Sequence, residues 1–376
     1  MNALSHILSE PDLSLYRLES TWAPDLLTFC ASTPLTRRIL NRPEIAGVEF
    51  TRNLQEAVTT ILRNFPDPVE RNRMREEGTG VVNFLRSGLN FGIRDALYDA
   101  WGFNAQLTSF ITSQRARDQF GRWFIRDDAY RKIELPYDST IFIGEIVATG
   151  VTMNNGLQIV GRMAKNLGRP IRNLVFFTIG CHKIEKALSD FHHLMRQTFP
   201  KYNATYLFYL EGKFHLADSR TKAAIKVQGT DLMRTPALLA PEFELEQFEP
   251  ARTALERCVI YDGGARAFNP HAHFLEVASY WREMAALGER GMSLSEALAE
   301  RWPCPEYFLD FQRFAQEKNK QWRGVGEKIL EDLYQAAGER RSRAFKLAAD
   351  EPGSLTEPAR ARLQSLEART PDPGHP

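Results

Sequence analysis

One twelve-residue segment, Ile141–Thr152, constrains the fold of this 376-residue chain more than any other. It begins in a run of apolar and β-branched residues, 140–143, which predicts a buried strand. Beyond the segment, residues 156–165 carry apolar side chains at helical spacing. Between strand and helix lies a turn of small and hydroxyl-bearing residues: Ala148, Thr149, Gly150, Val151 and Thr152. A strand, a tight turn and a helix in this order indicate an α/β protein.

The turn also has the properties of a phosphate-binding site. The first backbone N–H groups of a helix have no partner within the helix, and the helix dipole places positive charge at the same end. Gly150 allows the backbone to approach an anion closely, and the hydroxyls of Thr149 and Thr152 can donate hydrogen bonds.

This segment resembles the phosphoribosyl-pyrophosphate (PRPP) motif of type I phosphoribosyltransferases. In that motif an apolar strand is followed by two acids, two variable residues and Thr-Gly-x-Thr. Glu145 matches the second acid, while Gly144 stands in place of the first. The Thr-Gly-x-Thr half is intact at residues 149–152. For this motif alone, a structural loop of Thr and Gly between a strand and a helix is the alternative interpretation.

Three further segments follow the order found in uracil phosphoribosyltransferases. The stretch 80–90 is similar to the strand of that family that ends in Leu-Arg-Ala-Gly-Leu-Gly. Its terminal loop corresponds to Arg86, Ser87 and Gly88. An arginine at a strand end beside a glycine can make paired, charge-assisted hydrogen bonds to a diphosphate.

Residues 113–118 and 128–136 resemble the Arg-Asp-Glu and Tyr-Tyr-x-Lys-Leu-Pro stretches that precede the PRPP strand in that family. The resemblance implies that Arg115 or Arg117 reaches the pyrophosphate from a loop. The sequence does not choose between them, and for either one a solvated basic loop is an equal alternative.

The last segment, 260–268, resembles the closing Gly-Asp-Ala-Gly-Asp-Arg-x-Phe-Gly of the family, with Ala265 in place of the second Asp. In the family this segment completes the base pocket and contacts metal-bound PRPP. The resemblance therefore places acceptor binding at Tyr261, Asp262, Gly263 and Gly264.

The chemistry implied by the resemblance is transfer of phosphoribose from PRPP to a base or nucleotide-like acceptor, with release of pyrophosphate. Glu145, Asp262 and Arg86 are the expected catalytic residues, and Mg²⁺ is expected to arrive with PRPP rather than at a dedicated protein-ligated site. An acid introduced at Gly144 is expected to strengthen ribose binding. Because two acids of the family pattern are missing, a non-catalytic PRPP- or nucleotide-binding regulator or effector, as in bacterial phage defence, is the alternative. The third hypothesis is a scaffold protein that has a degenerate form of this fold and binds no ligand.

Strands that alternate with helices from residue 80 onward predict a Rossmann-like, doubly wound parallel sheet, the type I phosphoribosyltransferase fold. Two short strands, 206–210 and 213–216, are expected around a turn at Glu211-Gly212. The predicted organisation is a helical N-terminal flap at 1–75, an α/β core at 76–271 with an insertion at about 200–256, a helical extension at 272–349 and a flexible tail at 350–376.

Composition and termini favour a cytoplasmic protein. With 48 basic and 47 acidic residues, extensive nonspecific nucleic-acid binding is not expected. The N-terminus lacks the features of a signal peptide, no apolar run is long enough to span a bilayer, and the four scattered cysteines predict reduced thiols. No histidine or cysteine has metal-ligand spacing. The expected partners are PRPP or a related sugar phosphate and a small acceptor. A second copy of the chain and a protein bound to the helical extension are further candidates.

Overall fold

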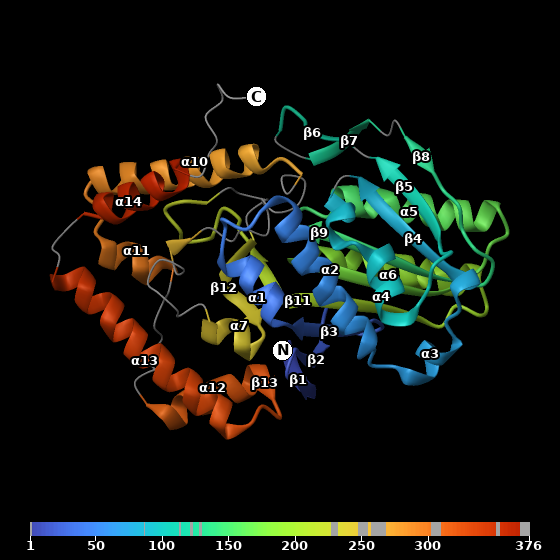
Figure 1. The fold of residues 1–376 in the computed structure, drawn as a ribbon, viewed down its shortest axis with the longest axis horizontal. Helices are drawn as coiled ribbons and strands as arrows, with labels where there is room; N and C mark the ends of the chain where they lie inside the picture. The colour runs from blue at the N-terminus through green and yellow to red at the C-terminus, as the bar shows by residue number, and fades with distance from the viewer. Residues whose placement is uncertain are drawn as a thin grey trace.

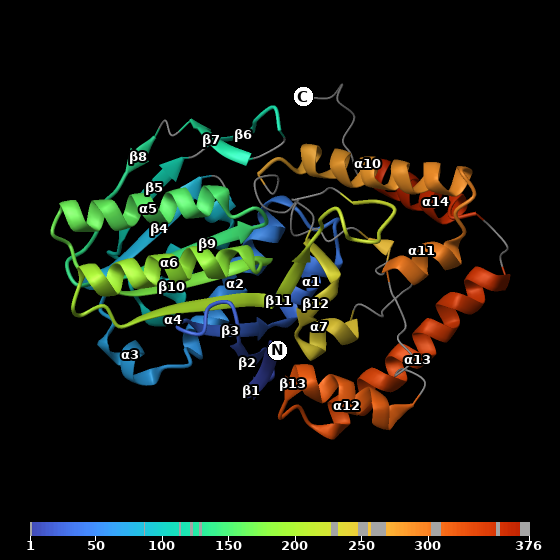
Figure 2. The ribbon, with the colours of Figure 1, turned by 180° about the vertical axis from the view of Figure 1, so that it is seen from behind.

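The computed structural model (Figures 1 and 2) describes residues 2–85, 87–112, 114–120, 123–127, 130–226, 232–246, 255–256, 268–301, 310–350 and 354–368. For residues 114–117, 123–127 and 340–350 it describes the backbone. No helix among these residues is long and apolar enough to cross a membrane.

An eleven-stranded sheet organises the molecule. Its central strands are mutually parallel, which confirms the expected α/β fold with a doubly wound parallel sheet. In spatial order they are β3 (Leu27–Ser32), β11 (Ala204–Leu216), β10 (Ile171–Cys181), β9 (Ser139–Val147), β4 (Thr79–Leu85) and β5 (Leu107–Thr112). The edges are completed by β13 (Trp322–Arg323), β1 (Ala3–Glu10) and β2 (Leu13–Glu19) beyond β3, and by β8 (Arg131–Lys132) beyond β5.

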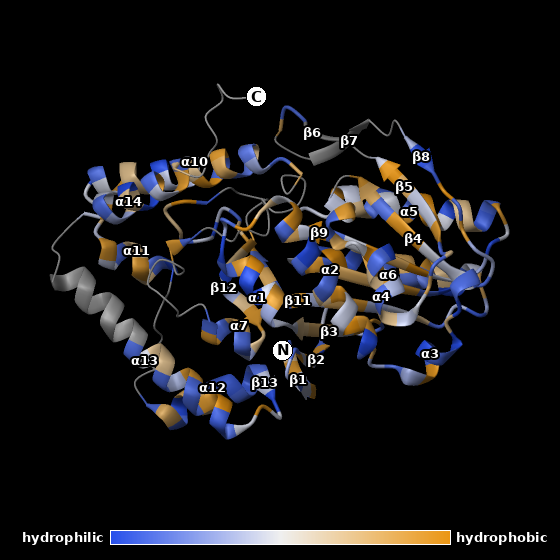
Figure 3. Cartoon of the chain, viewed as in Figure 1, coloured by the Kyte–Doolittle hydropathy of each residue, from blue (hydrophilic) through white to orange (hydrophobic). Residues whose placement is uncertain are grey.

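Helices cover both faces of the sheet. On one face lie α5 (Val151–Asn166) and α6 (Lys183–Thr198), and on the other lie α2 (Gly47–Arg63) and α4 (Ile93–Trp101) (Figures 1 and 2). The shorter helices are α1 (Pro34–Asn41), α3 (Pro68–Arg73), and the 3-10 helices η1 (Glu76–Gly78) and η2 (Ser87–Phe91). Because the central strands are covered on both sides, nearly every residue of β10 and β11 is buried, and most of these residues are hydrophobic (Figure 3).

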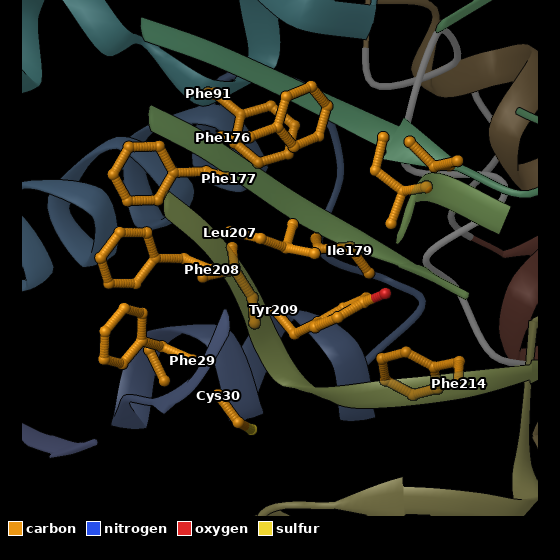
Figure 4. Packing of buried hydrophobic residues seen from close by; sticks show 14 of the residues in the cluster. Phe29, Cys30, Phe91, Phe176, Phe177, Ile179, Leu207, Phe208, Tyr209 and Phe214 are labelled. Atoms are coloured by element: carbon orange, nitrogen blue, oxygen red, sulfur yellow. The ribbon is translucent and has the colours of Figure 1, made fainter. Parts of the chain in front are cut away.

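The core contains a row of aromatic rings that crosses three parallel strands. The Phe208 ring stacks on Phe29 and on Phe177, with centroid separations of 5.1 Å in each case (Figure 4). The three residues are register partners on β3, β11 and β10. Each aromatic pair contributes about 0.5–1.5 kcal/mol beyond the burial of its apolar area, so this row fixes the strand register as well as filling the core.

The N-terminal region differs from the expected helical segment. Its first 32 residues form three strands, β1, β2 and β3, and helices begin only at Pro34. In β2 the side chains of Leu13, Leu15 and Leu18 are buried. The alternation of buried and exposed residues in such short strands is a weaker signal than the helical pattern at 47–63. The strand structure of this region depends on the pairing of β3 with β11.

The two strands expected around Glu211-Gly212 are one strand, β11. Both halves of β11 pair with β10 in parallel, with a register shift between them. Glu211 has φ 63° and Gly212 has φ 147°, so these residues form a bulge rather than a chain reversal. Past the bulge, β11 also pairs with the antiparallel strand β12 (Leu232–Leu239).

The bulge buries a carboxyl group, and this predicts a pH-dependent stability. Glu211 is fully buried, and its Oε1 accepts hydrogen bonds from the backbone N of Thr33 at 2.9 Å and from the Thr36 hydroxyl. Burial disfavours the charged form and raises the pKa of Glu211 to about 8. The folded chain thus retains a proton that the unfolded chain loses above about pH 4.3. As the pH rises from about 5 to about 8, we expect the free energy of unfolding to fall by a few kcal/mol, on the order of 1 kcal/mol per pH unit.

Urea unfolding of the wild type and of Glu211→Gln at pH 5 and pH 8 measures this effect. Gln preserves the acceptor for Thr33 and Thr36 but does not titrate, so its unfolding free energy should lose that pH dependence. Parallel pH profiles for the two proteins would contradict the assignment.

The C-terminal part is helical, as expected for the extension, and lies beside the sheet (Figure 1). Its described helices are α7 (Pro241–Glu246), α10 (Pro270–Glu289), α11 (Leu294–Arg301), α12 (Phe311–Gln321), α13 (Glu327–Asp350) and α14 (Thr356–Glu367). The expectation of a flexible tail at 350–376 is wrong for α14, which packs against α10. Leu355, Ala359 and Leu366 recur at helical spacing and are buried, so an apolar face lies hidden within a charged sequence.

A buried ion pair attaches α14. Arg362 Nε donates to Glu256 Oε1 at 2.5 Å, and Arg362 Nη2 donates to Glu44 at 3.2 Å. We expect Arg362→Met to lower the free energy of unfolding by about 3–5 kcal/mol, because it leaves the buried carboxylate of Glu256 without its cation. Arg360→Met, which removes a solvent-exposed pair with Glu289, is the matched control and should cost at most about 1 kcal/mol in urea unfolding. Equal losses in the two variants would contradict this role.

Candidate functional site

The order of the strands reverses between β4 and β9. From β4 the chain passes through α4 to β5 on one side, and from β9 it passes through α5 and α6 to β10 and β11 on the other side. In open α/β sheets, ligands bind outside the carboxyl ends of the strands at such a reversal. The structure places residues 87–88 after β4 and 148–152 after β9 at this point, as the sequence predicts.

The turn after β9 leads directly into the N-terminus of α5. Gly150 caps α5 with φ 74° and ψ −3°, the left-handed conformation that favours glycine. Residues 149–152 are half-buried, and the first turn of α5 contains no acid. The N–H groups that begin α5 therefore face an accessible site with the positive end of the helix dipole.

A hydrogen bond joins the loop after β4 to the acid on β9. The Ser87 hydroxyl donates to Glu145 Oε1, which also accepts from the backbone N of Ile146 at 3.1 Å. The Glu145 side chain is 6% exposed, and its backbone carbonyl accepts from the Thr178 hydroxyl at 2.8 Å. The carboxylate of Glu145 is thus held in place by Ser87 and the backbone, four residues before Thr149.

The position of the missing acid is closed by an aromatic ring. A Cβ atom at Gly144 would lie 2.8 Å from Cδ1 of Phe91, a fully buried residue at the end of η2. At Gly88, a Cβ atom would lie 3.2 Å from the Gly144 carbonyl oxygen. Both glycines therefore allow η2 to pack closely on β9. The expectation that an acid at residue 144 simply strengthens ribose binding is wrong for this packing.

Lys183 lies beside the turn at 149–152, and no sequence motif predicted it there. A Cβ atom at Gly150 would lie 3.4 Å from Cβ of Lys183, the exposed first residue of α6. A basic residue directly after the next strand of a parallel sheet is the signal that could have identified it, because neighbouring carboxyl ends share one edge. Lys183 adds a cation at the entrance to the turn.

The neighbouring residues Cys181 and His182 serve the structure around the turn. The Cys181 thiol donates to the Ala148 carbonyl at 3.1 Å, and burial raises its pKa to about 11, so it remains a thiol at neutral pH. The His182 ring lies 5.8 Å from the exposed Trp22 ring, and burial lowers its pKa, with the Lys183 charge acting in the same direction. Cys181 is fully buried, and the two residues do not form a nucleophile and base pair.

Several predicted site residues lie outside the described residues. These are Arg86 and the acceptor segment of Tyr261, Asp262, Gly263 and Gly264. Arg115 and Arg117 belong to β6 (Gln114–Arg117), whose side chains are also outside the description. With β7 (Trp123–Asp127), β6 forms a hairpin whose backbone contacts α5, the helix that begins at the phosphate turn (Figure 2). The hairpin therefore lies close to the site.

Within the described part of the chain, no group of three or more His, Cys, Asp or Glu side chains is arranged to hold a metal ion. Of the described residues that are assigned to this site, only Glu145 carries a carboxylate.

No protein-family model and no curated protein matches the chain. Among solved structures, it is similar to the hypoxanthine phosphoribosyltransferase of Staphylococcus aureus, at 11% identity and TM-score 0.25, over 42% of this chain and 76% of that one. The hypoxanthine-guanine enzyme of L. donovani matches at 11% identity and TM-score 0.25, over 44% and 82% of the two chains. The Trypanosoma cruzi hypoxanthine enzyme in complex with IMP matches at 12% identity and TM-score 0.25, over 43% and 79%. The chain is an α/β protein with a mainly parallel sheet, and these structural neighbours are type I phosphoribosyltransferases.

Proposed function

We propose that this protein binds PRPP at the carboxyl edge of its sheet and transfers the phosphoribosyl group to a base or nucleotide-like acceptor, releasing pyrophosphate. One observation carries the proposal: the Ser87–Glu145 hydrogen bond beside the turn at 149–152, at the reversal of strand order. This arrangement supports the proposal, because a sugar phosphate needs an anion-binding turn and a carboxylate at the same edge of the sheet.

The proposed roles follow from the chemistry of each group. The N–H groups at 150–152 and the cation of Lys183 bind the 5-phosphate, and Glu145 accepts hydrogen bonds from the ribose hydroxyls. In the transfer, the bond from C1 of the ribose to the diphosphate oxygen breaks with its electron pair leaving on the diphosphate, and a bond from C1 to the acceptor nitrogen forms. The cationic character at C1 resembles that of glycoside hydrolysis. The protein contributes mainly by positioning the two reactants.

The remaining groups of the proposal come from the resemblance. Arg86 and either Arg115 or Arg117 would neutralise the departing diphosphate, and Asp262 would lie near the acceptor. Because the described site offers one carboxylate, we propose that Mg²⁺ enters bound to PRPP; when bound, it neutralises part of the diphosphate charge.

A second candidate function is a non-catalytic PRPP or nucleotide sensor. The observation that favours it is the Phe91 ring, which occupies the place of the first acid of the motif. Binding of the 5-phosphate needs only the turn, whereas turnover needs the ribose held in a reactive geometry as well. In this case the helical extension would carry the signal to a partner.

Incubation with PRPP, Mg²⁺ and a panel of bases separates the two candidates. We expect PRPP to raise the melting temperature and at least one base to cause pyrophosphate release; uracil and hypoxanthine in the panel test the subfamily of the acceptor. In the matched variant Glu145→Gln, pyrophosphate release should fall more than the PRPP-induced shift does. A shift with no release for any base favours the sensor, and the absence of a shift would rule out both.

A further inference from the structure

A second pocket lies at the opposite edge of the sheet. It has a volume of about 600 Å³ and is formed by α3, η1 and the amino ends of β9 and β10. β9 runs from this edge to the phosphate turn over nine residues, which is about 26 Å at 3.3 Å per residue. The pocket is therefore separate from the proposed PRPP site, and its volume is typical of sites for small organic ligands.

Charged residues dominate the walls. Four arginines (Arg73, Arg75, Arg169 and Arg172) face three acids (Glu70, Glu77 and Asp138), which leaves one excess positive charge. Glu70 is 4% exposed, pairs with Arg73, and lies 3.6 Å from Arg172. Arg169 is exposed, and its guanidinium has no ion-pair or hydrogen-bond partner among the described residues.

Two groups in this pocket have unmet hydrogen bonds. Asp138 adopts φ 51°, and its buried Oδ1 has no hydrogen-bond partner in the described part of the chain. The same holds for Nε of Arg172, which lies 3.6 Å from Glu70 Oε2, beyond hydrogen-bond length; Nη1 of Arg172 lies 3.8 Å from Asp138 Oδ2. A buried ionic network that is only partly satisfied costs stability, and a left-handed residue adds strain. Both unpartnered atoms are enclosed by the protein, and a ligand can reach the exposed parts of the same two side chains.

The charged groups that a ligand can reach indicate its chemistry. Arg169 and the partly exposed guanidinium of Arg172 favour an anionic acceptor, whereas the partly exposed Asp138 carboxylate favours an N–H or O–H donor. The exposed side chains of Tyr137 and Leu107 supply an apolar wall on which a planar group can pack. We propose that this pocket is a second ligand site that binds a nucleoside phosphate. The phosphate contacts the arginines, hydroxyl or amino groups contact Asp138, and the base packs against Tyr137.

Calorimetric titration of the full chain with AMP, GMP, CMP and UMP tests this proposal. The titrations use the Gly150→Asp protein, in which the phosphate turn carries a carboxylate, so that binding reports the second pocket alone. We expect at least one nucleotide to bind with the same affinity as in the wild type. Inorganic phosphate and the matching nucleoside should each bind at least ten times more weakly than that nucleotide.

Two variants localise the binding. Asp138→Asn preserves shape and tolerates the left-handed backbone, and Arg169→Ala removes an unpaired surface cation, so both should fold. Each should weaken nucleotide binding by tenfold or more, whereas Arg162→Ala, which removes a charge from α5 outside the pocket, should not. The proposal is overturned if no nucleotide binds to Gly150→Asp, if inorganic phosphate binds as tightly as the nucleotide, or if both pocket variants bind like the wild type. None of these outcomes depends on whether PRPP is a substrate.

Discussion

Replacement of Gly150 by Asp is expected to weaken PRPP binding by about 100-fold without unfolding the protein. The new carboxylate would lie at the N-terminus of α5, where the 5-phosphate is proposed to bind. Two like charges about 5 Å apart at an effective dielectric constant of about 20 repel by roughly 3 kcal/mol, which corresponds to a factor of about 100 in affinity. The same carboxylate should stabilise the helix by about 0.3–1 kcal/mol. Calorimetric titration with PRPP and Mg²⁺, together with urea unfolding, measures both effects.

Gly150→Asn is the matched control for this prediction. Asn has the same shape and tolerates the left-handed φ of 74°, and the nearest atom to its Cβ, Cβ of Lys183, lies at 3.4 Å. It should therefore bind PRPP much more tightly than the Asp variant does. Equal weakening by Asn and Asp would show that backbone shape, and not charge, controls binding at this turn.

Replacement of Gly144 by Asp is expected to destabilise the protein by about 3 kcal/mol. The new side chain would overlap the Phe91 ring and would place a carboxylate against a buried aromatic surface. In the Phe91→Gly background both the ring and the Phe91 Cβ, which would lie 2.5 Å from a Cβ at residue 144, are absent, so the added cost of Asp should be less than about 1 kcal/mol. Urea unfolding of the two single variants and the double variant gives this coupling energy.

The double variant also tests the proposed ribose contact. Once the Phe91 side chain is removed, the carboxylate at residue 144 can accept a hydrogen bond from a ribose hydroxyl, and PRPP should bind about tenfold more tightly than to Phe91→Gly alone. Additive destabilisation, or unchanged PRPP affinity in the double variant, would contradict the position that we assign to the sugar.

The parts of the fold that depend on local chemistry could be predicted from the sequence. The turn at 148–152 forms as expected because Gly150 and the flanking strand and helix patterns act over short distances. The resemblance assigns Ser87 and Glu145 to one binding site, and in the structure the Ser87 hydroxyl donates a hydrogen bond to Glu145.

The features that the sequence did not predict depend on distant contacts. In the sequence, Phe91 cannot be distinguished from other core residues. The packing of η2 on β9 shows that its side chain excludes an acid at residue 144. Glu211 and Gly212 are residues typical of a turn. The parts of β11 before and after them both pair with β10, so the two residues form a bulge. The helix α14 has a charged sequence, and its burial depends on α10 and on the ion pair between Arg362 and Glu256.

The most direct measurement is amide NMR of the turn itself. In a deuterated sample labelled with ¹⁵N at glycine, valine and threonine, PRPP with Mg²⁺ should shift the amide resonances of Gly150, Val151 and Thr152, and ribose 5-phosphate should shift the same three. Unchanged resonances at these residues under conditions where calorimetry shows PRPP bound would contradict the account, because the phosphate would then be held elsewhere.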